Sequence, residues 1–300
     1  MMNMKKELSQ LNYGIIGLGI MGGSIAKAIR TNILGTTDKS CTGKIIALDK
    51  NKDSLALAKN EKIIDESFMP EQTNQMLKEC DILFICLYPH ATLEFLRQHK
   101  NDYKDDSIIT DISGVKALIQ NDFDSLCPPN ANLILGHPMA GGEKEGFAAS
   151  KGEYFKNHNY ILITQKNDKA RKDARELLKK LVSAMGFTRI TETDSNTHDN
   201  KIGFTSQLCH VVASAMVESA EDPEITSFGG GSFEDLTRIA MINAPLWTEL
   251  FLANKEKLCA HIETFKKHIE EIQRLIENED EEGLKTLLSD VREKRIQMQK

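Results

Sequence analysis

The chain has 300 residues, which is enough for two domains of ordinary size that each bury a core. Hydrophobic residues make up 40% and charged residues 27%, as in a soluble globular protein, and the net charge of −6 argues against nucleic acid or an anionic membrane as the main partner. No segment reads as a signal peptide or a membrane span. Six cysteines without Cys-x-x-Cys spacing predict reduced thiols and a cytoplasmic protein.

Residues 13–24 begin as a short apolar strand, turn at three glycines and continue with helical periodicity. Within this Gly-x-Gly-x-x-Gly pattern, Gly17 permits a tight turn, Gly19 lets the backbone approach a pyrophosphate, and Gly22 brings the helix close to the strand. The start of the helix offers unpaired N–H groups and a partial positive charge to the phosphates. The pattern therefore predicts a dinucleotide site, and a plain strand–turn–helix unit is the alternative.

An apolar run over residues 44–49 ends in Asp49, close to where the second strand of a dinucleotide-binding fold should end. A carboxylate there accepts hydrogen bonds from the adenosine ribose and repels a 2′-phosphate, so Asp49 favours NAD, while Lys50 and Lys52 keep NADP open. The expected dinucleotide contacts are Gly17, Gly19, Ile20, Met21, Gly22, Asp49, Leu87 and Tyr88.

Strand and helix signals alternate through the first part of the chain. The expected strands after residue 49 cover 63–64, 81–89, 107–111, 132–136, 160–164 and 187–191, and the expected helices cover 54–59, 72–79 and 168–185. Several of these strands are apolar throughout, which is typical of parallel strands that are buried on both faces. The alternation predicts an α/β fold, a doubly wound parallel sheet of the Rossmann type, in a dinucleotide-binding domain over residues 10–192.

From residue 193 onward the strand signals vanish, and the sequence predicts an all-helical domain over residues 193–300. Helices are expected over 202–219, 233–241, 245–278 and 282–297, with a break at the glycines 229–231. The long C-terminal helices carry an apolar stripe that needs a partner surface, so a homodimer through these helices is expected. Packing within the chain alone is the alternative.

In an open α/β sheet, ligands bind beyond the carboxyl ends of the strands. Three such strand ends carry polar groups, at residues 87–90, 111–116 and 136–143. In the last of them, a proline and a glycine-rich turn follow His137, and an imidazole fixed in this way suits proton transfer near neutral pH. Ser113, at a neighbouring strand end, is expected to hydrogen-bond this imidazole and set its tautomer. For His137 taken alone, a structural role is the alternative.

Together these segments resemble the prephenate dehydrogenase family of tyrosine biosynthesis, including its arogenate-using members, over nearly the whole chain. Residues 137–143 match the family's His-Pro-Met-Ala-Gly-x-Glu block, and residues 111–116 loosely match its Asp-x-x-Ser-Val-Lys segment. Residues 198–199 look like the His-Asp pair at the start of the family's helical domain. Residues 233–240 and 245–247 are similar to its Phe-x-Asp-x-Thr-Arg-Ile-Ala and Pro-x-x-Trp blocks.

The chain departs from the family pattern at residues 206–210. Many members have Ser-His-Leu-Pro-His there, whereas this chain has Ser-Gln-Leu-Cys-His. Gln207 thus replaces a histidine and Cys209 replaces a proline. The change alters a polar group of the expected substrate pocket and leaves the exact substrate open.

The resemblance implies an NAD-dependent oxidative decarboxylation of prephenate, which yields 4-hydroxyphenylpyruvate and carbon dioxide. His137 would hold the ring hydroxyl and accept its proton as the ring carbon passes a hydride to the nicotinamide. Arg238 would bind a substrate carboxylate, because a guanidinium pairs with a carboxylate through two hydrogen bonds. Glu143 would gate the pocket, contact the pyruvyl end, or meet the amino group of arogenate.

The expected site thus combines groups from both parts of the chain. Its catalytic residues are His137 and Ser113, and its substrate-binding residues are Arg238, Glu143, His198, Gln207 and His210. No metal is expected, because no acid or cysteine completes a ligand set of recognisable spacing around the histidines. Trp247, the single tryptophan, is expected to pack in the helical core.

Three other functions stay open. An arogenate dehydrogenase would produce tyrosine directly. A β-hydroxyacid dehydrogenase has a similar Gly-Leu-Gly-x-Met-Gly turn, but its catalytic Gly-x-x-x-Asn-x-x-Lys pattern is missing here. A non-catalytic nucleotide-sensing protein would account for the glycine turn but not for the set of histidine, serine and arginine.

Overall fold

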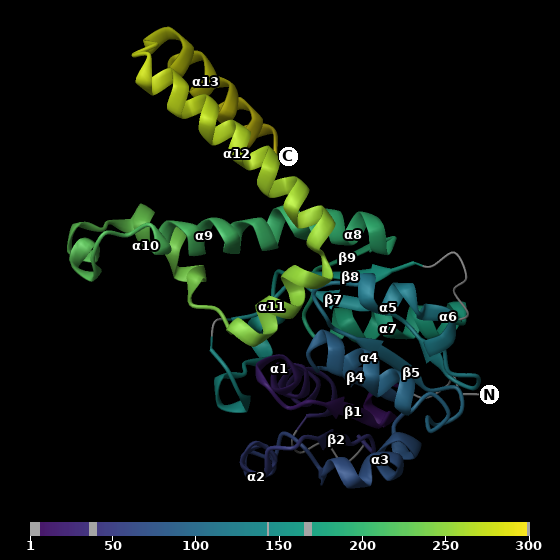
Figure 1. Ribbon diagram of the computed structural model, residues 1–300. Helices are drawn as coiled ribbons and strands as arrows, with labels where there is room; N and C mark the ends of the chain where they lie inside the picture. Colours follow the sequence, from purple (N-terminus) through teal and green to yellow (C-terminus); the bar gives the residue numbers. More distant parts are fainter. Residues whose placement is uncertain (1–6, 36–40, 143, 165–169, 299–300) are drawn as a thin grey trace.

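The structure is a computed structural model that describes residues 7–35, 41–142, 144–164 and 170–298. Its first part is built around a six-stranded parallel sheet with the order β3-β2-β1-β4-β5-β6 (Figure 1). The strands are β1 (Tyr13–Ile16), β2 (Ile45–Leu48), β3 (Glu66–Phe68), β4 (Ile82–Ile85), β5 (Ile108–Asp111) and β6 (Asn132–Leu133). From β1 to β3 the chain builds the sheet toward one edge. It then returns to place β4 on the other side of β1 and continues toward the opposite edge, which confirms the predicted doubly wound sheet.

Helices cover both faces of this sheet, so every residue of β1, β2, β4 and β5 is buried. They are α1 (Ile20–Ile29), α2 (Lys52–Asn60), α3 (Thr73–Glu79), α4 (Pro89–Gln98), α5 (Ala117–Asn121), α6 (Phe123–Leu126) and α7 (Lys172–Ala184). On β1, Ile15 belongs to a core shared with α1 and α7, whereas Ile16 belongs to a second core shared with α3 and α4. Short 3₁₀ or π-helical turns cover Leu8–Gln10, Arg30–Leu34, Pro70–Gln72, Phe147–Ala149 and Gly152–Phe155.

The expected strand over 132–136 is divided between two sheets. Ile134 N donates to Ile109 O in the large sheet, whereas Ile163 N donates to Leu135 O in a smaller one. The smaller sheet has the order β7-β8-β9, made of β7 (Gly136–Pro138), β8 (Asn159–Ile163) and β9 (Arg189–Thr193). Because β7 and β8 are antiparallel and β8 and β9 are parallel, the expectation that these strands extend one parallel sheet is wrong.

The short strand expected at residues 63–64 is also displaced. The N–H groups of Ile63 and Ile64 both donate to Ala58 O at the end of α2, at 2.9 and 3.4 Å. The chain joins the sheet only afterwards, when Asp65 N donates to Ile45 O at 2.8 Å, and β3 begins at Glu66. These two isoleucines therefore close a helix rather than start a strand.

After β9, every element that the structure describes is helical (Figure 1). The α-helices are α8 (Ser195–Ile202), α9 (Leu208–Glu218), α10 (Gly231–Thr237), α11 (Ala244–Ala253), α12 (Lys255–Glu277) and α13 (Glu281–Gln297). A π-helical turn, Gly203–Gln207, joins α8 to α9, and 3₁₀ turns cover Pro223–Phe228 and Arg238–Ala240. α12 and α13 pack side by side as a hairpin that extends away from the rest of the chain.

The helix expected over 245–278 is broken at Asn254. The side-chain amide of this residue is buried, and its Nδ2 donates to the backbone oxygen of Asp199 and to Oε1 of Gln207, at 2.8 and 2.7 Å. The break therefore directs α11 toward the sheet and α12 away from it (Figure 1). No helix within the described ranges is long and apolar enough to cross a membrane.

Candidate active site

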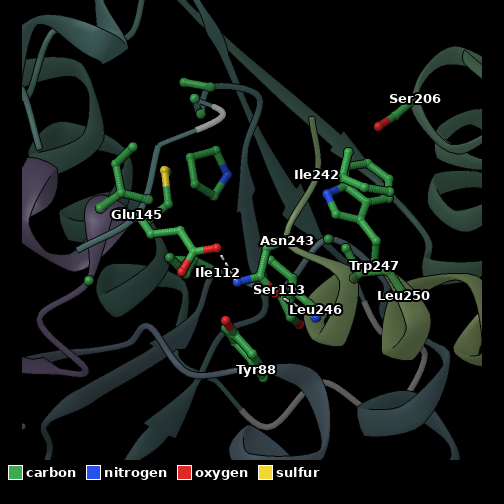
Figure 2. Close-up of a pocket in the computed structure, with 18 of the residues that line it drawn as sticks. Tyr88, Ile112, Ser113, Glu145, Ser206, Ile242, Asn243, Leu246, Trp247 and Leu250 are labelled. Atoms are coloured by element: carbon green, nitrogen blue, oxygen red, sulfur yellow. Dashed lines mark hydrogen bonds between the residues drawn. The ribbon is translucent and has the colours of Figure 1, made fainter. Parts of the chain in front are cut away.

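A cavity of about 640 Å³ lies where the carboxyl ends of the strands meet the helical part (Figure 2). Such a volume suits a small-molecule site. Its walls come from the glycine turn, the ends of β4, β5 and β7, and the helices α9 and α11. Of the expected site residues, the structure brings together at this cavity Gly19, Ile20, Met21, Leu87, Tyr88, Ser113, His137, Gln207, His210 and Arg238.

The three glycines of the turn differ in what surrounds them. At Gly17, where φ is +91°, an added Cβ would lie 2.7 Å from Cys86 O, and at Gly22 it would lie 2.0 Å from Gly17 O. These two positions exclude a side chain because the backbone itself fills the space. At Gly19, which borders the cavity, a Cβ would meet nothing within 4 Å. The open space in front of Gly19 is the place where a pyrophosphate would approach the start of α1.

Asp49 lies beside the turn and supports it. One carboxylate oxygen accepts the N–H of Leu18 at 2.5 Å, and the other accepts the N–H of Asn51 at 2.7 Å. The cavity-lining residues do not include Asp49, Gly17 or Gly22. The carboxylate therefore fixes the backbone before Gly19, and the ribose contact expected from the sequence stays a prediction.

His137 lies at the end of the hydrogen-bonded series Asp199–His198–His137. Its Nδ1 is 2.9 Å from Nε2 of His198, and Nδ1 of His198 is 2.7 Å from Oδ1 of Asp199. Nε2 of His137 faces Gly114, where an added Cβ would lie 3.8 Å away, and both residues line the cavity. His198 is 2% exposed and lies behind His137, so the expectation that it lines the substrate pocket is wrong.

Ser113 does not hydrogen-bond His137, contrary to expectation. Its hydroxyl donates to Oδ2 of the Asp111 carboxylate, although Ser113 still lines the cavity. The Asp111 carboxylate also pairs with Lys116, whose Nζ lies 2.6 Å away, and both side chains are fully buried. Nζ of Lys116 donates in addition to Gly136 O at 2.5 Å, which fixes the backbone immediately before His137.

The environment keeps both imidazoles neutral. Burial lowers the pKa of His137 well below its ordinary value, and the nearby His198 and Lys116 lower it further. Burial likewise lowers the pKa of His198, although the hydrogen bond to Asp199 opposes that shift. Burial also lowers the pKa of Lys116 against the attraction of Asp111. A neutral His137 has one nitrogen that can accept a proton, as a general base requires.

The helical part supplies the opposite wall. Arg238 is exposed, begins the turn Arg238–Ala240 after α10 and lines the cavity. His210 donates from Nδ1 to Ile239 O at 2.8 Å, and its ring packs on Trp247 with centroids 3.6 Å apart. Trp247 is half-buried and lines the cavity, so it does more than pack in the helical core (Figure 2).

Gln207 also lines the cavity, but its amide is already paired. Nε2 donates to Leu250 O at 2.8 Å, and Oε1 accepts from Asn254 at 2.7 Å. The residue is 1% exposed. Gln207 therefore holds the turn before α9 against α11 and against the junction of α11 and α12.

The loop after β7 forms the rim of the cavity. Glu143 lies outside the described residues, so its expected role as a substrate contact stays a prediction. Glu145 accepts a hydrogen bond of 2.6 Å from Asn243, and both residues line the cavity (Figure 2). Sequence reasoning missed Asn243, although an asparagine before Ala-Pro is a recognisable helix N-cap signal. Within the described part of the chain, no group of three or more His, Cys, Asp or Glu residues could hold a metal ion.

Comparisons with known proteins agree with this architecture. The prephenate dehydrogenase nucleotide-binding domain matches residues 33–186, and the prephenate dehydrogenase dimerization domain matches residues 194–290. The chain is 30% identical to prephenate dehydrogenase of Bacillus subtilis, covering 90% of this chain and 71% of that protein. It is 32% identical to prephenate dehydrogenase of Lactococcus lactis, covering 90% of this chain and 72% of that protein.

A solved structure extends the likeness to the whole fold. Prephenate dehydrogenase from A. aeolicus, in complex with hydroxyphenyl propionate and NAD+, is 30% identical with a TM-score of 0.85, covering 98% of this chain and 100% of that chain. The sequence and the structure of this chain are therefore similar to those of prephenate dehydrogenases over both the nucleotide-binding and the helical part. The chain belongs to the prephenate dehydrogenase family of oxidoreductases.

Proposed function

We propose that this protein oxidatively decarboxylates prephenate to 4-hydroxyphenylpyruvate with NAD as the oxidant, a step of tyrosine biosynthesis. One observation carries the proposal: His137, Arg238 and the open backbone at Gly19 border the same cavity. A proton acceptor, a cation for a carboxylate and a place for a dinucleotide are the three groups that this reaction needs. The names of the relatives from Bacillus subtilis and Lactococcus lactis support the same substrate.

The residues at the glycine turn fit a dinucleotide. Gly19, Ile20 and Met21 line the cavity at the start of α1, where the first N–H groups of a helix have no partners within the helix. Leu87 and Tyr88 border the same region. Bound NAD supplies a hydride acceptor. The carboxylate of Asp49 disfavours a 2′-phosphate through its charge, which supports NAD over NADP.

The substrate chemistry then assigns roles to two side chains. Arg238 binds a carboxylate of the dianionic substrate through charge-assisted hydrogen bonds. Nε2 of His137 accepts the ring hydroxyl proton as the hydride leaves the same carbon, so a ketone forms. The ring carboxylate departs as carbon dioxide, its electron pair makes the ring aromatic, and the phenolate oxygen takes the proton back. Ser113 acts through Asp111 and Lys116, which hold the backbone that precedes His137.

The assembly is proposed to be a homodimer of two-domain chains, with nucleotide and helical domains over residues 10–192 and 193–300. The matched dimerization domain supports this state. The C-terminal hairpin also exposes an apolar row that a second copy would cover, consisting of Ile269, Ile272, Ile276, Leu288 and Val291. All six cysteines are free thiols, as in a reducing compartment, and we place the enzyme in the cytoplasm.

A matrix of two substrates and two cofactors tests the proposal. Purified full-length protein is assayed with prephenate and with arogenate, each with NAD and with NADP, and formation of the reduced nicotinamide is followed. The highest kcat/KM is expected for prephenate with NAD. A higher value for arogenate would make the protein an arogenate dehydrogenase. No turnover with either substrate, despite NAD binding, would overturn the assignment of this cavity.

A further inference from the structure

In each hydrogen bond behind His137, the donor and the acceptor can be assigned, and the assignment starts at Asp199. Two backbone N–H groups and one imidazole nitrogen lie within hydrogen-bond distance of this one carboxylate. Oδ1 accepts from Nδ1 of His198 at 2.7 Å and from Lys116 N at 2.9 Å, and Oδ2 accepts from Ala117 N at 2.8 Å. A carboxylate has no proton to donate, so it can only accept in each of these three contacts. Nδ1 of His198 therefore carries a proton.

The proton on Nδ1 of His198 then determines which imidazole donates in the bond between His198 and His137. In a neutral imidazole with a proton on Nδ1, Nε2 is an acceptor, so Nε2 of His198 accepts from Nδ1 of His137 across 2.9 Å. With its own proton on Nδ1, His137 has its lone pair on Nε2, the atom that faces Gly114 and the cavity. The charged side chains that act on this pair of imidazoles are Lys116, Asp111 and Asp199.

We infer that His198 and Asp199 are positioning residues that hold His137 in the single tautomer able to take a proton from the substrate. Neither residue touches the cavity, so neither is a catalytic residue in its own right. The inference rests on the proposed function, because it says how the base of that reaction is prepared. It goes further by assigning the His-Asp pair at 198–199 a role in the tautomeric state of another residue.

The same carboxylate also joins the two parts of the chain. Asp199 lies on α8, whereas the N–H groups of Lys116 and Ala117 belong to the segment that starts α5. Asn254 holds the backbone of Asp199 from the junction of α11 and α12. Docking of the helical part on the nucleotide-binding part therefore places the acceptor that sets the tautomer. The base becomes competent only in the assembled chain.

Nitrogen NMR of the imidazoles in the full chain tests the inference without any substrate. For His137 in the wild-type protein, we expect the proton on Nδ1 and a bare Nε2, near neutral pH. The bare nitrogen is assigned to His137 by its loss in His137→Asn. A proton on Nε2 of His137 would overturn the inference even if the protein turns over prephenate. The expected tautomer in a protein that lacks this turnover would instead contradict only the proposed function.

Two substitutions at His198 separate the hydrogen bond from simple packing. His198→Leu removes the acceptor for Nδ1–H of His137. The kcat should fall about 10- to 100-fold, by analogy with the loss of a hydrogen-bond partner that orients a metal-bound imidazole. The KM for prephenate and the NAD affinity should change less than about twofold. His198→Gln keeps an amide oxygen as acceptor, and at least half of the lost activity, on a logarithmic scale, should return.

A matched control is available on α12. His261 also hydrogen-bonds α8, with Nε2 3.0 Å from Asn200 O, but it lies outside the series. His261→Leu should leave kcat and the His137 tautomer unchanged. Equal losses in His198→Leu and His198→Gln with an unaltered tautomer would reduce His198 to a packing role. If His198→Leu does not fold, the wild-type tautomer and the Gln variant still decide the question.

Discussion

The carboxylate of Glu145 accepts a hydrogen bond of 2.6 Å from the side-chain amide of Asn243, and this bond joins the loop after β7 to the start of α11 (Figure 2). Asn243 has a second function at the same place, because its Oδ1 accepts the N–H of Leu246 and caps α11. Both residues line the cavity. One asparagine thus caps a helix and connects the two sides of the cavity rim.

Substitutions at Asn243 should separate these two functions. Asn243→Asp keeps a capping oxygen, so the free energy of unfolding should change little. It also sets two carboxylates against each other at the rim, where the wild-type protein has a hydrogen bond. The KM for prephenate should rise about twofold to tenfold, the equivalent of one exposed hydrogen bond. Asn243→Ala also loses the cap, and its unfolding free energy should fall by about 0.5–2 kcal/mol. A wild-type KM in Asn243→Asp would show that the bond does not shape the site.

The glycines of the turn should respond differently to the same added methyl group. Gly19→Ala places its Cβ in open space with φ at −79°, so the thermal midpoint should stay near that of the wild type while NAD binding weakens. Gly22→Ala would place its Cβ 2.0 Å from Gly17 O and should destabilise the fold by about 1–3 kcal/mol. Titration calorimetry with NAD and thermal unfolding of both variants check this contrast. Wild-type affinity for NAD in Gly19→Ala would contradict the proposal that the pyrophosphate lies against Gly19.

Much of the fold could be predicted from local sequence patterns. The strands β1, β2, β4 and β5 are buried on both faces. Such strands appear in the sequence as nearly continuous apolar runs, which can be recognised without a structure. The division of residues 132–138 between two sheets could not be predicted from local sequence. It depends on pairing with strands that lie elsewhere in the sequence, β5 for β6 and β8 for β7. The break at Asn254 has the same origin, since its partners Asp199 and Gln207 are distant in sequence.

The candidate site was predictable as a set of residues but not as a set of contacts. Strand ends and the resemblance placed His137, Ser113 and Arg238 at one site, and the structure puts all three around one cavity. Which group would hydrogen-bond the imidazole depended on the docking of α8, and His198 took the place expected for Ser113. Lys116 was missed because a buried lysine has no local signal that distinguishes it from an exposed one.

The two neutral imidazoles make the fold sensitive to acid. In the unfolded chain they take up protons below a pH of about 6.5, whereas in the folded chain their lowered pKa values keep them unprotonated. The unfolded state then binds more protons, so stability falls as pH falls, by up to about 1.4 kcal/mol per pH unit for each imidazole. Denaturant unfolding between pH 7.5 and pH 5.5 should show a shallower loss in His137→Asn than in the wild type. Equal slopes would contradict a neutral buried His137.

Arg238 should govern substrate affinity rather than the chemical step. Arg238→Gln removes a charge-assisted pair with a carboxylate, and the KM for prephenate should rise about 10- to 100-fold. The NAD affinity and kcat should change little, because the guanidinium lies in the helical wall of the cavity. Arg274→Gln on α12, where the arginine pairs with Glu271 at the surface, is the matched control and should behave as the wild type. An unaltered KM in Arg238→Gln would assign the substrate carboxylate to another residue.

The role of His137 as the proton acceptor is decided by one pair of numbers for His137→Asn, kcat with prephenate and the dissociation constant of NAD. Asparagine fills similar space but offers no basic nitrogen, so kcat should fall by about 10²- to 10⁴-fold. The dissociation constant should stay within about twofold of the wild-type value, because the glycine turn is untouched. Wild-type kcat in this variant would contradict the assignment of the base, whatever the substrate proves to be.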